Sequence, residues 1–301
     1  MTAISHVLTV FNKAWALPDV WRSLAAQRGE HVREFIFVDD GSTDNSVELL
    51  RGFAKSDPRI RIIENSANAG PAIRLNQGVV AAQGRWLHLI DGDDAVPPNA
   101  CERMLLAAQS YGAPLVYGRR RVTKADPIPE DAGFALIDTP LVFAAERPIV
   151  HMALMVERDL FSAAGGCDER IFIQDQSLPL RLCAKADRML WTDATVACQN
   201  PEQPGELSRN RMQQHHDRFF SAYNVLSTLR GPIAADAALR RLCASAHWKA
   251  RRDSPNKAPA WLSAPFAEYL KSKMKMLPDN RKLDAFAEDF LAMDGIRRPA
   301  P

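Results

Sequence analysis

The sequence lacks the features of membrane-spanning, disulfide-stabilised and strongly charged proteins. No apolar run in its 301 residues approaches the ~18 residues that a transmembrane helix needs. The five cysteines show no CxxC spacing, a pattern typical of reduced thiols in a cytosolic compartment. The formal net charge of +2 argues against a dedicated nucleic-acid-binding protein. We therefore expect a cytoplasmic globular protein that does not bind nucleic acid.

Two phosphate-binding signatures are also missing. The chain contains neither GxGxxG nor GxxxxGKS/T, so the sequence does not favour a dinucleotide-binding protein or a P-loop nucleotidase. It has no internal repeat and no low-complexity segment. Residues 1–11 carry no basic stretch and no cleavage-site pattern, and they predict a first strand rather than a signal peptide.

The first third of the chain alternates short apolar strands with amphipathic helices. Strands are expected at residues 5–11, 35–38, 59–64 and 86–90, and helices at 16–27, 45–55, 72–82 and 99–110. Ser42 or Thr43 is placed to cap the second of these helices. Strands joined by crossover helices predict an α/β fold, with a mostly parallel central sheet flanked by helices.

Beyond Tyr111 the pattern is less regular. We expect strands at 115–117, 151–157, 189–192 and 196–199, a loop over 126–138, and helices at 158–164 and 174–186. The segment 200–206 has two prolines and one glycine, the composition of a boundary. Almost everything after it is helical in pattern. The predicted organisation is a sheet domain at 1–200 and a C-terminal helical extension at 201–301.

Two of the expected strands end in clusters of aspartates. Asp39 and Asp40 begin the string DDGS, and Asp91-Gly92-Asp93-Asp94 follows the strand at 86–90. Ligands of such sheets bind at the carboxyl ends of strands, so two clusters together are more informative than either alone. Crowded carboxylates suit Mg²⁺ or Mn²⁺, and a strand-end carboxylate can accept hydrogen bonds from a base or a ribose. Taken singly, each string also fits a helix cap, a turn or a solvated acidic loop.

The order of the motifs resembles the inverting glycosyltransferases of family 2, which have the GT-A fold. The resemblance rests on VLTVFNK, FIFVDDGSTDNS, ANAGPAIRLNQGVVAAQGRWLHLIDGDD and GGCDERIFIQDQSLPLRL, in this order, within roughly the first 200 residues. It implies a GT-A type nucleotide-diphospho-sugar transferase with a nucleotide-binding half at 1–110 and an acceptor half at 111–200. It does not cover the last hundred residues.

The resemblance assigns the nucleotide contacts residue by residue. Thr9 and Phe11, followed by Asn12, would line the pocket for the base, although many family members carry proline and tyrosine at the first two positions. Asp39 and Asp40 would bind the base and the ribose, with Asp40 on the base imide. A further nucleotide contact is implied for Arg74, which stands one place away from the arginine of the common pattern.

The same resemblance assigns the metal and the chemistry. Asp91 and Asp93 form a DxD pattern, in which Asp93 would bind Mn²⁺ or Mg²⁺ directly and Asp91 would lie toward the ribose. The ion would bridge the diphosphate and neutralise charge on the leaving group. Asp175 occupies the position of the catalytic base, which would deprotonate an acceptor hydroxyl. Gln174 stands where the family usually has an acid. The acceptor side would contain Gly166, Asp168, Glu169 and His151, of which Asp168 and Glu169 are alternative acids.

The helical extension offers weaker signals. His215-His216 lies where some relatives place a histidine that meets the metal or pyrophosphate, but adjacent residues on a helix point to different faces. Residues 261–277 combine aromatic and aliphatic side chains with three lysines. Periodicity favours packing of this helix on the core or on another subunit, giving a homo-oligomer, over contact with the inner face of an anionic membrane.

The predicted function is therefore metal-dependent transfer of a sugar from a nucleotide-diphospho-sugar, UDP-linked, to a hydroxyl of a glycan or glycolipid. The reaction would invert the anomeric configuration and serve cell-surface polysaccharide or lipopolysaccharide biosynthesis. One alternative is a catalytically inactive nucleotide-sugar-binding module whose helical extension is an interaction platform. A phosphatase with an aspartyl nucleophile is disfavoured, because such enzymes usually place that aspartate after the first strand.

Overall fold

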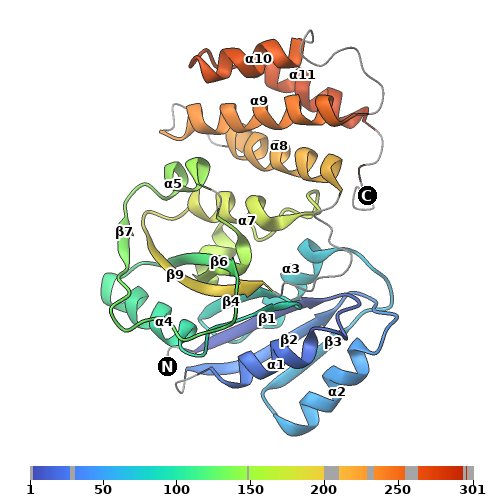
Figure 1. Cartoon of the computed structure of the whole chain (residues 1–301), viewed down its shortest axis with the longest axis vertical. Coiled ribbons are helices and arrows are strands. Elements are labelled where there is room, and N and C mark those ends of the chain that lie inside the picture. The colour runs from blue at the N-terminus through green and yellow to red at the C-terminus, as the bar shows by residue number, and fades with distance from the viewer. Residues whose placement is uncertain are drawn as a thin grey trace.

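The computed structural model describes residues 3–27, 31–147, 149–199, 210–228, 234–254, 264–293 and 296. A central sheet with helices on both faces forms the lower body, and the C-terminal helices lie above it (Figure 1). The expected mixture of a flanked central sheet and a helical C-terminal region is confirmed.

The sheet contains nine strands among the described residues, in the order β3-β2-β1-β4-β8-β6-β9-β5, with β7 paired to β9. Their bounds are β1 Ile4–Val10, β2 Val32–Asp39, β3 Ile60–Glu64, β4 Trp86–Asp91, β5 Asp94–Ala95, β6 Leu115–Val122, β7 Ala135–Ile137, β8 Leu154–Glu157 and β9 Met189–Gln199. The strands β1 to β4 are parallel, as expected. The second half is mixed, because β8 runs antiparallel to both β4 and β6.

The helices of the sheet domain follow the expected positions closely. They are α1 Leu17–Ala25, α2 Ser46–Ser56, α3 Pro71–Ala81, α4 Ala100–Tyr111, α5 Pro140–Glu146, α6 Arg158–Ala163 and α7 Gln174–Cys183, with the 3₁₀ turn η1 at His151–Ala153. The extension comprises α8 Arg211–Thr228, α9 Asp236–Asp253, α10 Ala264–Lys273 and α11 Asn280–Leu291. None of the helices in these described ranges is long and apolar enough to cross a bilayer.

Strands buried on both faces explain the continuous apolar runs of the sequence. Alternate residues of a strand point to opposite faces, so each strand contributes to two separate cores. Val7 and Leu89 belong to one core with α3 and α7. Leu8 and Ile90 belong to the other core, which α1 and α4 cover.

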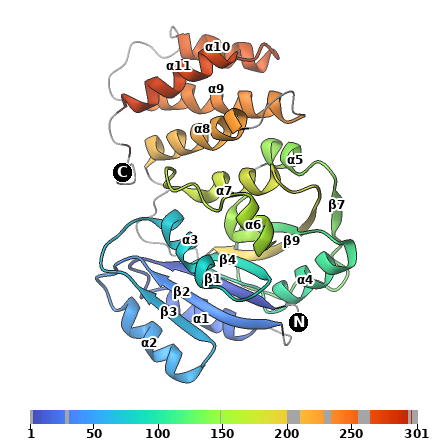
Figure 2. The ribbon, with the colours of Figure 1, turned by 180° about the vertical axis from the view of Figure 1, so that it is seen from behind.

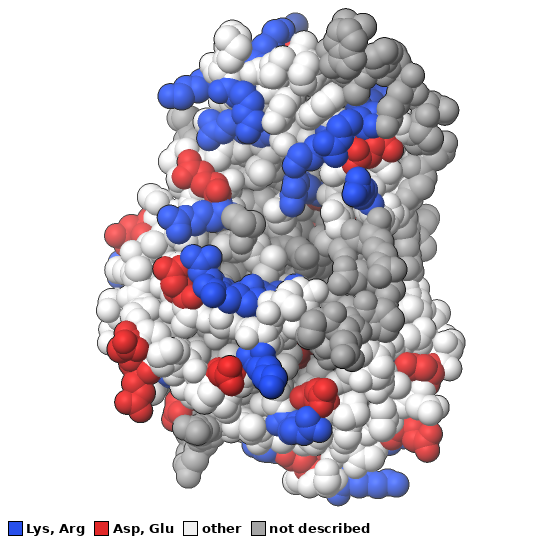
Figure 3. Space-filling view, viewed as in Figure 1, with Lys and Arg blue, Asp and Glu red and all other residues white. Residues whose placement is uncertain are grey.

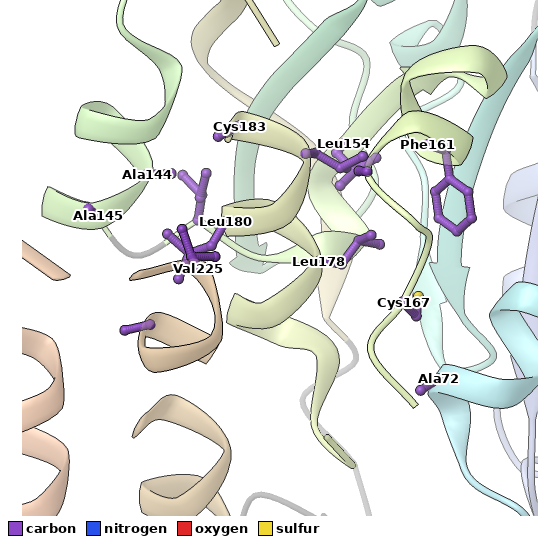
Figure 4. Close-up of a cluster of buried hydrophobic side chains, with 14 of the residues drawn as sticks. Ala72, Ala144, Ala145, Leu154, Phe161, Cys167, Leu178, Leu180, Cys183 and Val225 are labelled. Carbon is purple, nitrogen blue, oxygen red and sulfur yellow. The ribbon is translucent and has the colours of Figure 1, made fainter. Parts of the chain in front are cut away.

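The C-terminal helices share the first of these cores rather than forming one of their own. Leu178 and Leu180 of α7, Val225 of α8 and Leu239 of α9 belong to the same cluster of buried side chains. Figure 4 shows Val225 beside Leu180 and the alanines of α5. The view from behind likewise shows α8 lying directly over α7 (Figure 2). The predicted boundary segment, 200–206, lies outside the described residues.

Several local predictions were wrong. The expected loop at 126–138 contains β7, the two expected strands at 189–192 and 196–199 are one strand, β9, and His151 begins a 3₁₀ turn rather than a strand. Neither Ser42 nor Thr43 caps α2: the Asp44 carboxylate accepts the N–H of Ser46 instead. Pairing with distant strands decides these short segments, and single-segment patterns do not contain that information.

Helix α10 packs on α9. Phe266 and Tyr269 both contact the ring of Trp248 on α9. This supports the packing interpretation of the aromatic residues in that helix. Leu270, Met274 and Met276 remain exposed at its end. Trp261 and Leu262, at the start of the expected helix, lie outside the described residues.

Candidate active site

The two aspartate clusters lie on either side of the carboxyl end of β1. In the parallel pairing, Val10 lies opposite Asp39 of β2, and Thr9 lies opposite Asp91 of β4. The backbone N–H groups of Asp40 and Gly92 donate to the carbonyls of Val10 and Thr9 respectively. A Cβ on residue 92 would come within 2.7 Å of the Thr9 carbonyl oxygen, so this turn requires glycine. The predicted convergence of acidic strand ends is therefore present.

The loop after β1 is bound to the loop after β2. The side chain of Asn12, a residue with a positive φ of 53°, accepts the N–H of Thr43 at 2.8 Å. Ser42 and Ser46 hydroxyls accept the N–H groups of Asn12 and Lys13 at 3.0 and 2.9 Å. These contacts fix the segment that follows Thr9, and within it Phe11 is 41% exposed.

Asp40 is engaged by the protein itself. Its carboxylate accepts the N–H groups of Ala69 and Gly70 at 2.7 and 2.9 Å, and the Arg74 Nε donates to it at 2.7 Å. Arg74 also donates to the Ala67 carbonyl at 2.6 Å. Both charged groups are buried. The pair therefore holds the loop before α3 in place. Arg74 is linked to the end of β2 by its ion pair with Asp40.

Asp39 has one carboxylate oxygen in use and one that is not. Its Oδ2 accepts the N–H groups of Gly41 and Ser42, both at 3.0 Å. Its Oδ1 is buried and has no hydrogen-bond partner among the described residues. A buried, unused acceptor is costly unless something donates to it. Of the two aspartates, Asp39 is the one with an oxygen left for a ligand.

Asp91 is held by a histidine. The Nε2 of His151, from η1, lies 3.2 Å from the Asp91 Oδ1. Burial raises the pKa of Asp91, but the nearby cations, His151 first among them, more than offset it and lower the pKa to about 2. The side chain remains 28% exposed. Asp91 is therefore an ionised carboxylate with one edge open to solvent.

The pKa of Asp93 is shifted in the opposite direction to that of Asp91. Burial and the neighbouring charge of Asp91 raise its pKa, and the ammonium group of Lys13 works against them. The Lys13 Nζ donates directly to the Asp93 Oδ2. Asp94 is fully buried, and the Nε and Nη2 of Arg120 donate to its two oxygens at 2.8 and 2.9 Å. The carboxylates of Asp91, Asp93 and Asp94 are thus in contact with His151, Lys13 and Arg120 respectively.

The Asp91 and Asp93 carboxylates fit a divalent cation by the chemistry of their donors. Both are hard oxygen ligands on one short turn, and their mutual repulsion shows that the turn favours positive charge. An ammonium group already occupies one oxygen of Asp93. Sequence reasoning missed Lys13 and Arg120; their only signals were a basic residue after the first strand and the run Arg119–Arg121. Arg119 itself pairs with Asp193 at 2.6 Å.

The GGCDE loop is fixed from two sides. The side chain of Asn76 on α3 accepts the N–H of Cys167 at 2.9 Å and donates to Glu169 at 2.8 Å. A Cβ on residue 166, where φ is +64°, would lie 2.6 Å from the Asn76 Oδ1, so Gly166 is required there. This loop therefore connects α3 to the segment that precedes α7.

The carboxylate of Asp168 is bound by side chains of the protein itself. Arg170 donates to both of its oxygens at 2.9 and 2.8 Å, and the Asn224 side chain of α8 donates at 2.9 Å. Burial raises its pKa, but the contacts with Arg170 and Asn224 outweigh burial and lower it. A carboxylate tied in this way is a poor proton acceptor. Glu169 is exposed and engaged by Asn76.

Asp175 is the second residue of α7, and the placement of its side chain lies outside what the structure describes. Its surroundings are clear. The preceding Gln174 is buried and donates to the carbonyls of Asp168 and Ile171 at 3.1 and 2.5 Å, so it acts as an internal brace. The N–H of Ile173, at the helix start, donates to the Asp217 carboxylate of α8 at 2.7 Å. Helix α7 also packs on η1, which carries His151.

The two histidines of the extension are engaged away from the aspartate turn. His216 Nδ1 contacts Asp217 at 2.7 Å, and His215 Nε2 contacts Asp253 at 3.1 Å. Burial lowers the pKa of His215 despite the attraction of Asp253. The structure brings neither of them to Asp91 or Asp93 by any described contact.

A second group of metal-type ligands lies in the core. The Nδ1 atoms of His6 and His88 are 3.1 Å apart, and the Cys101 sulfur lies 3.4 Å from His88. All three are buried, and His6 stacks on Phe35 at 4.9 Å. Burial lowers the pKa of His88 to about 4, so the pair is neutral near pH 7. We interpret it as a core hydrogen bond.

The chain is similar in sequence to known glycosyltransferases. Residues 5–133 match the family model described as Glycosyl transferase family 2. The chain is 30% identical over 168 residues to the succinoglycan biosynthesis protein ExoO of Rhizobium meliloti, covering 52% of this chain and 47% of that protein. It is 33% identical over 115 residues to the glycosyltransferase GlyG of Streptococcus pneumoniae, covering 38% of each. Both matches span less than half of the relative's own length.

Solved structures show the same fold over nearly the whole chain. TarS 1–349 of S. aureus in complex with UDP-GlcNAc has a TM-score of 0.68 at 14% identity, covering 94% of this chain and 83% of that chain. The mannosyltransferase PcManGT of Pyrobaculum calidifontis in complex with GDP-Man and Mn²⁺ has a TM-score of 0.61 at 17% identity, covering 96% and 87%. Residues 5–133 are therefore similar to glycosyl transferase family 2, and the chain has the GT-A fold.

Proposed function

We propose that the protein transfers a sugar from a nucleotide-diphospho-sugar, most simply a UDP-sugar, to a hydroxyl of a glycan or glycolipid acceptor with inversion. The observation that carries the proposal is the placement of Asp39 and Asp91 on opposite sides of the carboxyl end of β1. In sheets of this type, that edge is where nucleotides bind. The name of one relative, a succinoglycan biosynthesis protein, supports a role in polysaccharide biosynthesis.

On the donor side, the unused Oδ1 of Asp39 is the acceptor we assign to the base imide. Asp39 thus replaces Asp40 as the residue assigned to the base imide. The oxygens of Asp40 already accept hydrogen bonds from the N–H groups of Ala69, Gly70 and Arg74. The exposed ring of Phe11 offers an apolar face to the nucleoside. Asn12 shapes this pocket through its backbone conformation and its contact with Thr43.

Asp93, together with Asp91, would hold Mn²⁺ or Mg²⁺. A bound divalent ion stabilises the charge that develops on a nucleoside diphosphate leaving group. Lys13 contributes a positive charge at the same turn, and His151 orients Asp91. PcManGT was solved with Mn²⁺, which supports a metal at this type of site.

On the acceptor side, we assign the base to Asp175. The competing acids are unfavourable, because Asp168 is bound by Arg170 and Asn224, and Glu169 holds Asn76. A base near the attacking hydroxyl removes its proton as the oxygen attacks the anomeric carbon in line with the leaving group. Such a single displacement inverts configuration.

Thermal denaturation with a panel of nucleoside diphosphates, with and without Mn²⁺, tests the donor half. We expect one base to stabilise the wild type, and Asp93→Ala to lose the metal-dependent part of that stabilisation. Asp175→Asn should keep the stabilisation and lose transfer. If Asp175→Asn turned over near the wild-type rate, the base would be another residue. If no nucleotide stabilised the wild type in any condition, the proposed function would be wrong.

A further inference from the structure

Four basic side chains lie on α8, α9 and α10, of which α9 packs against both other helices, and the charges of three of them act on the fourth, Lys249. They are Arg218 of α8, Lys249 and Arg252 of α9, and Lys273 of α10, and we call them the basic patch. Contact between His215 and Asp253 brings the start of α8 to the end of α9, and the stacking of Trp248 on Tyr269 brings α10 to the same end. Figure 3 shows Lys and Arg side chains gathered on the part of this face where Figure 1 places α8 and α9.

The patch has more positive charge than its own acids can balance. Asp253 is the carboxylate within it, and Arg252 and His215 both contact this one group, at 2.8 and 3.1 Å. Lys249 forms no hydrogen bond or ion pair among the described residues. Burial lowers its pKa, and the charges of Arg218, Arg252 and Lys273 lower it further. Clustered cations repel one another, and an anion bound among them relieves that repulsion.

The patch is connected to the turn that carries the proposed base. The Nε of Arg218 donates to the Gln176 side chain at 3.0 Å, and Gln176 directly follows Asp175 in the first turn of α7. Asp217, next to Arg218, accepts the N–H of Ile173 at the start of the same helix. Helix α8 therefore connects an anion bound at the patch to the start of α7, where the proposed base Asp175 would deprotonate the acceptor hydroxyl.

We propose that the basic patch binds phosphate groups of the acceptor, which makes the substrate class a phosphate-bearing glycan or glycolipid. The inference rests on the proposed function. Arg and Lys are the side chains that proteins use for phosphate, through fork-shaped and point-charge contacts respectively. The run Arg119–Arg121 is a poorer candidate, since Arg119 and Arg120 are already paired with Asp193 and Asp94. The phosphate could belong to a lipid diphosphate or to a phosphodiester chain.

Binding of two probes to the full chain distinguishes these sources. One probe is farnesyl diphosphate and the other is a short glycerol phosphate oligomer, with maltotriose as the uncharged control. Saturating nucleoside diphosphate and Mn²⁺ are present throughout, so that the donor site is filled. We expect at least one phosphate probe to bind the wild type, with an affinity that falls as salt rises. The probe that binds identifies the source.

The variants locate the binding. The double variant Lys249→Glu/Lys273→Glu should bind the phosphate probe about tenfold more weakly or worse, since two attractive charges become repulsive. Lys249→Arg keeps the charge and should stay within about twofold of the wild type. Lys55→Glu, an exposed residue of α2, is the matched charge-reversal control and should also stay within about twofold.

Three results would overturn the inference. They are no binding of either phosphate probe, equal binding by the double variant, and recruitment by the patch to phosphatidylglycerol vesicles without affinity for either soluble probe, which would make it a membrane surface. Stabilisation by the nucleoside diphosphate is measured in the same proteins. If it is intact while phosphate binding fails, this inference alone is wrong. If it is absent from the wild type, the proposed function fails as well.

Discussion

At the scale of single residues, the ion pair between Lys13 and Asp93 decides how the aspartate turn meets a metal. The ammonium group contacts one oxygen of the carboxylate that we assign to the cation, so the two compete for this carboxylate. The side chain of Lys13 is 27% exposed and that of Asp93 is 7% exposed, so the pair is only partly screened by water. Lys13 therefore stabilises the turn while no metal is bound and weakens the turn's affinity for one.

The variant Lys13→Met tests this competition. Removing the ammonium takes away one of the positive charges that offset the repulsion between Asp91 and Asp93, so we expect Mn²⁺ to bind about tenfold more tightly in the absence of nucleotide. Titration followed by the electron paramagnetic resonance signal of free Mn²⁺ measures this directly. Lys55→Met is the control. Weaker Mn²⁺ binding by Lys13→Met would mean that the lysine supports the metal site instead of competing with it.

Substitution of the two adjacent aspartates at the end of β2, Asp39 and Asp40, is expected to affect different properties. Asp40→Asn removes one charge of a buried pair and leaves Arg74 uncompensated, which should lower the free energy of unfolding by about 3 kcal/mol. Asp39→Asn can keep an oxygen for the N–H groups of Gly41 and Ser42, but it replaces the unused acceptor by a donor. It should weaken nucleotide binding by about tenfold with little loss of stability.

Urea denaturation and nucleotide titration of both variants separate these effects. The reverse outcome, with Asp40→Asn stable and nucleotide-deficient, would return the base contact to Asp40.

At the scale of elements, α8 supports the segment 168–176, which we propose as the acceptor side, and it shares the core of the sheet domain rather than forming a separate module. Three of its side chains reach the segment 168–176: Asp217 to Ile173, Arg218 to Gln176, and Asn224 to Asp168. Asp217 is buried and also receives Gln213 and His216, so its position is closely defined. A shift of α8 would therefore move the start of α7, and Asp175 with it.

Asp217→Ala should reduce turnover without changing donor binding. The truncation leaves the Ile173 N–H and the Gln213 amide without their acceptor, at a cost of about 1–3 kcal/mol in local stability. We expect kcat to fall about tenfold or more, with the KM for the donor unchanged. Asp217→Asn, which keeps an oxygen acceptor, should recover part of the loss.

Asp284→Ala, a change in α11, provides the control, because Asp284 contacts Tyr223 on another part of α8. It removes the exposed contact to the Tyr223 hydroxyl at 2.8 Å and should leave kcat unchanged. A parallel rise in donor KM for Asp217→Ala would instead indicate general loosening of the fold.

At the scale of the whole molecule, the parts that sequence patterns predicted are those encoded locally. The strands β1, β2 and β4 are largely apolar because both of their faces are covered, and the acidic ends of β2 and β4 are visible as the strings DDGS and DGDD. The contacts that complete the site join distant residues: Lys13 and Asp93 are 80 positions apart, and Ile173 and Asp217 are 44 apart. The insertion of β8 between β4 and β6 is equally non-local. Pairings of this kind leave no periodic signal in either segment.

The buried histidines predict how the stability of the whole molecule depends on pH. Burial lowers the pKa of His88 from 6.5 to about 4, so between these values the unfolded chain takes up a proton that the folded chain does not. The stability that this residue contributes is present above pH 6.5 and is lost as the pH falls toward 4. One such group changes the free energy of unfolding by up to about 1.4 kcal/mol per pH unit.

Urea denaturation of the wild type and of His88→Gln at several values between pH 7 and pH 4.5 measures this dependence. Asp94 titrates in the opposite sense, because burial and its acidic neighbours raise its pKa, but it is present in both proteins and cancels in the comparison. We expect the wild type to lose roughly 1 kcal/mol per pH unit more than the variant. His31→Gln should follow the wild type, since this residue lies in the loop before β2. Equal slopes in wild type and His88→Gln would mean that His88 is protonated in the folded core, with His6 as its hydrogen-bond acceptor.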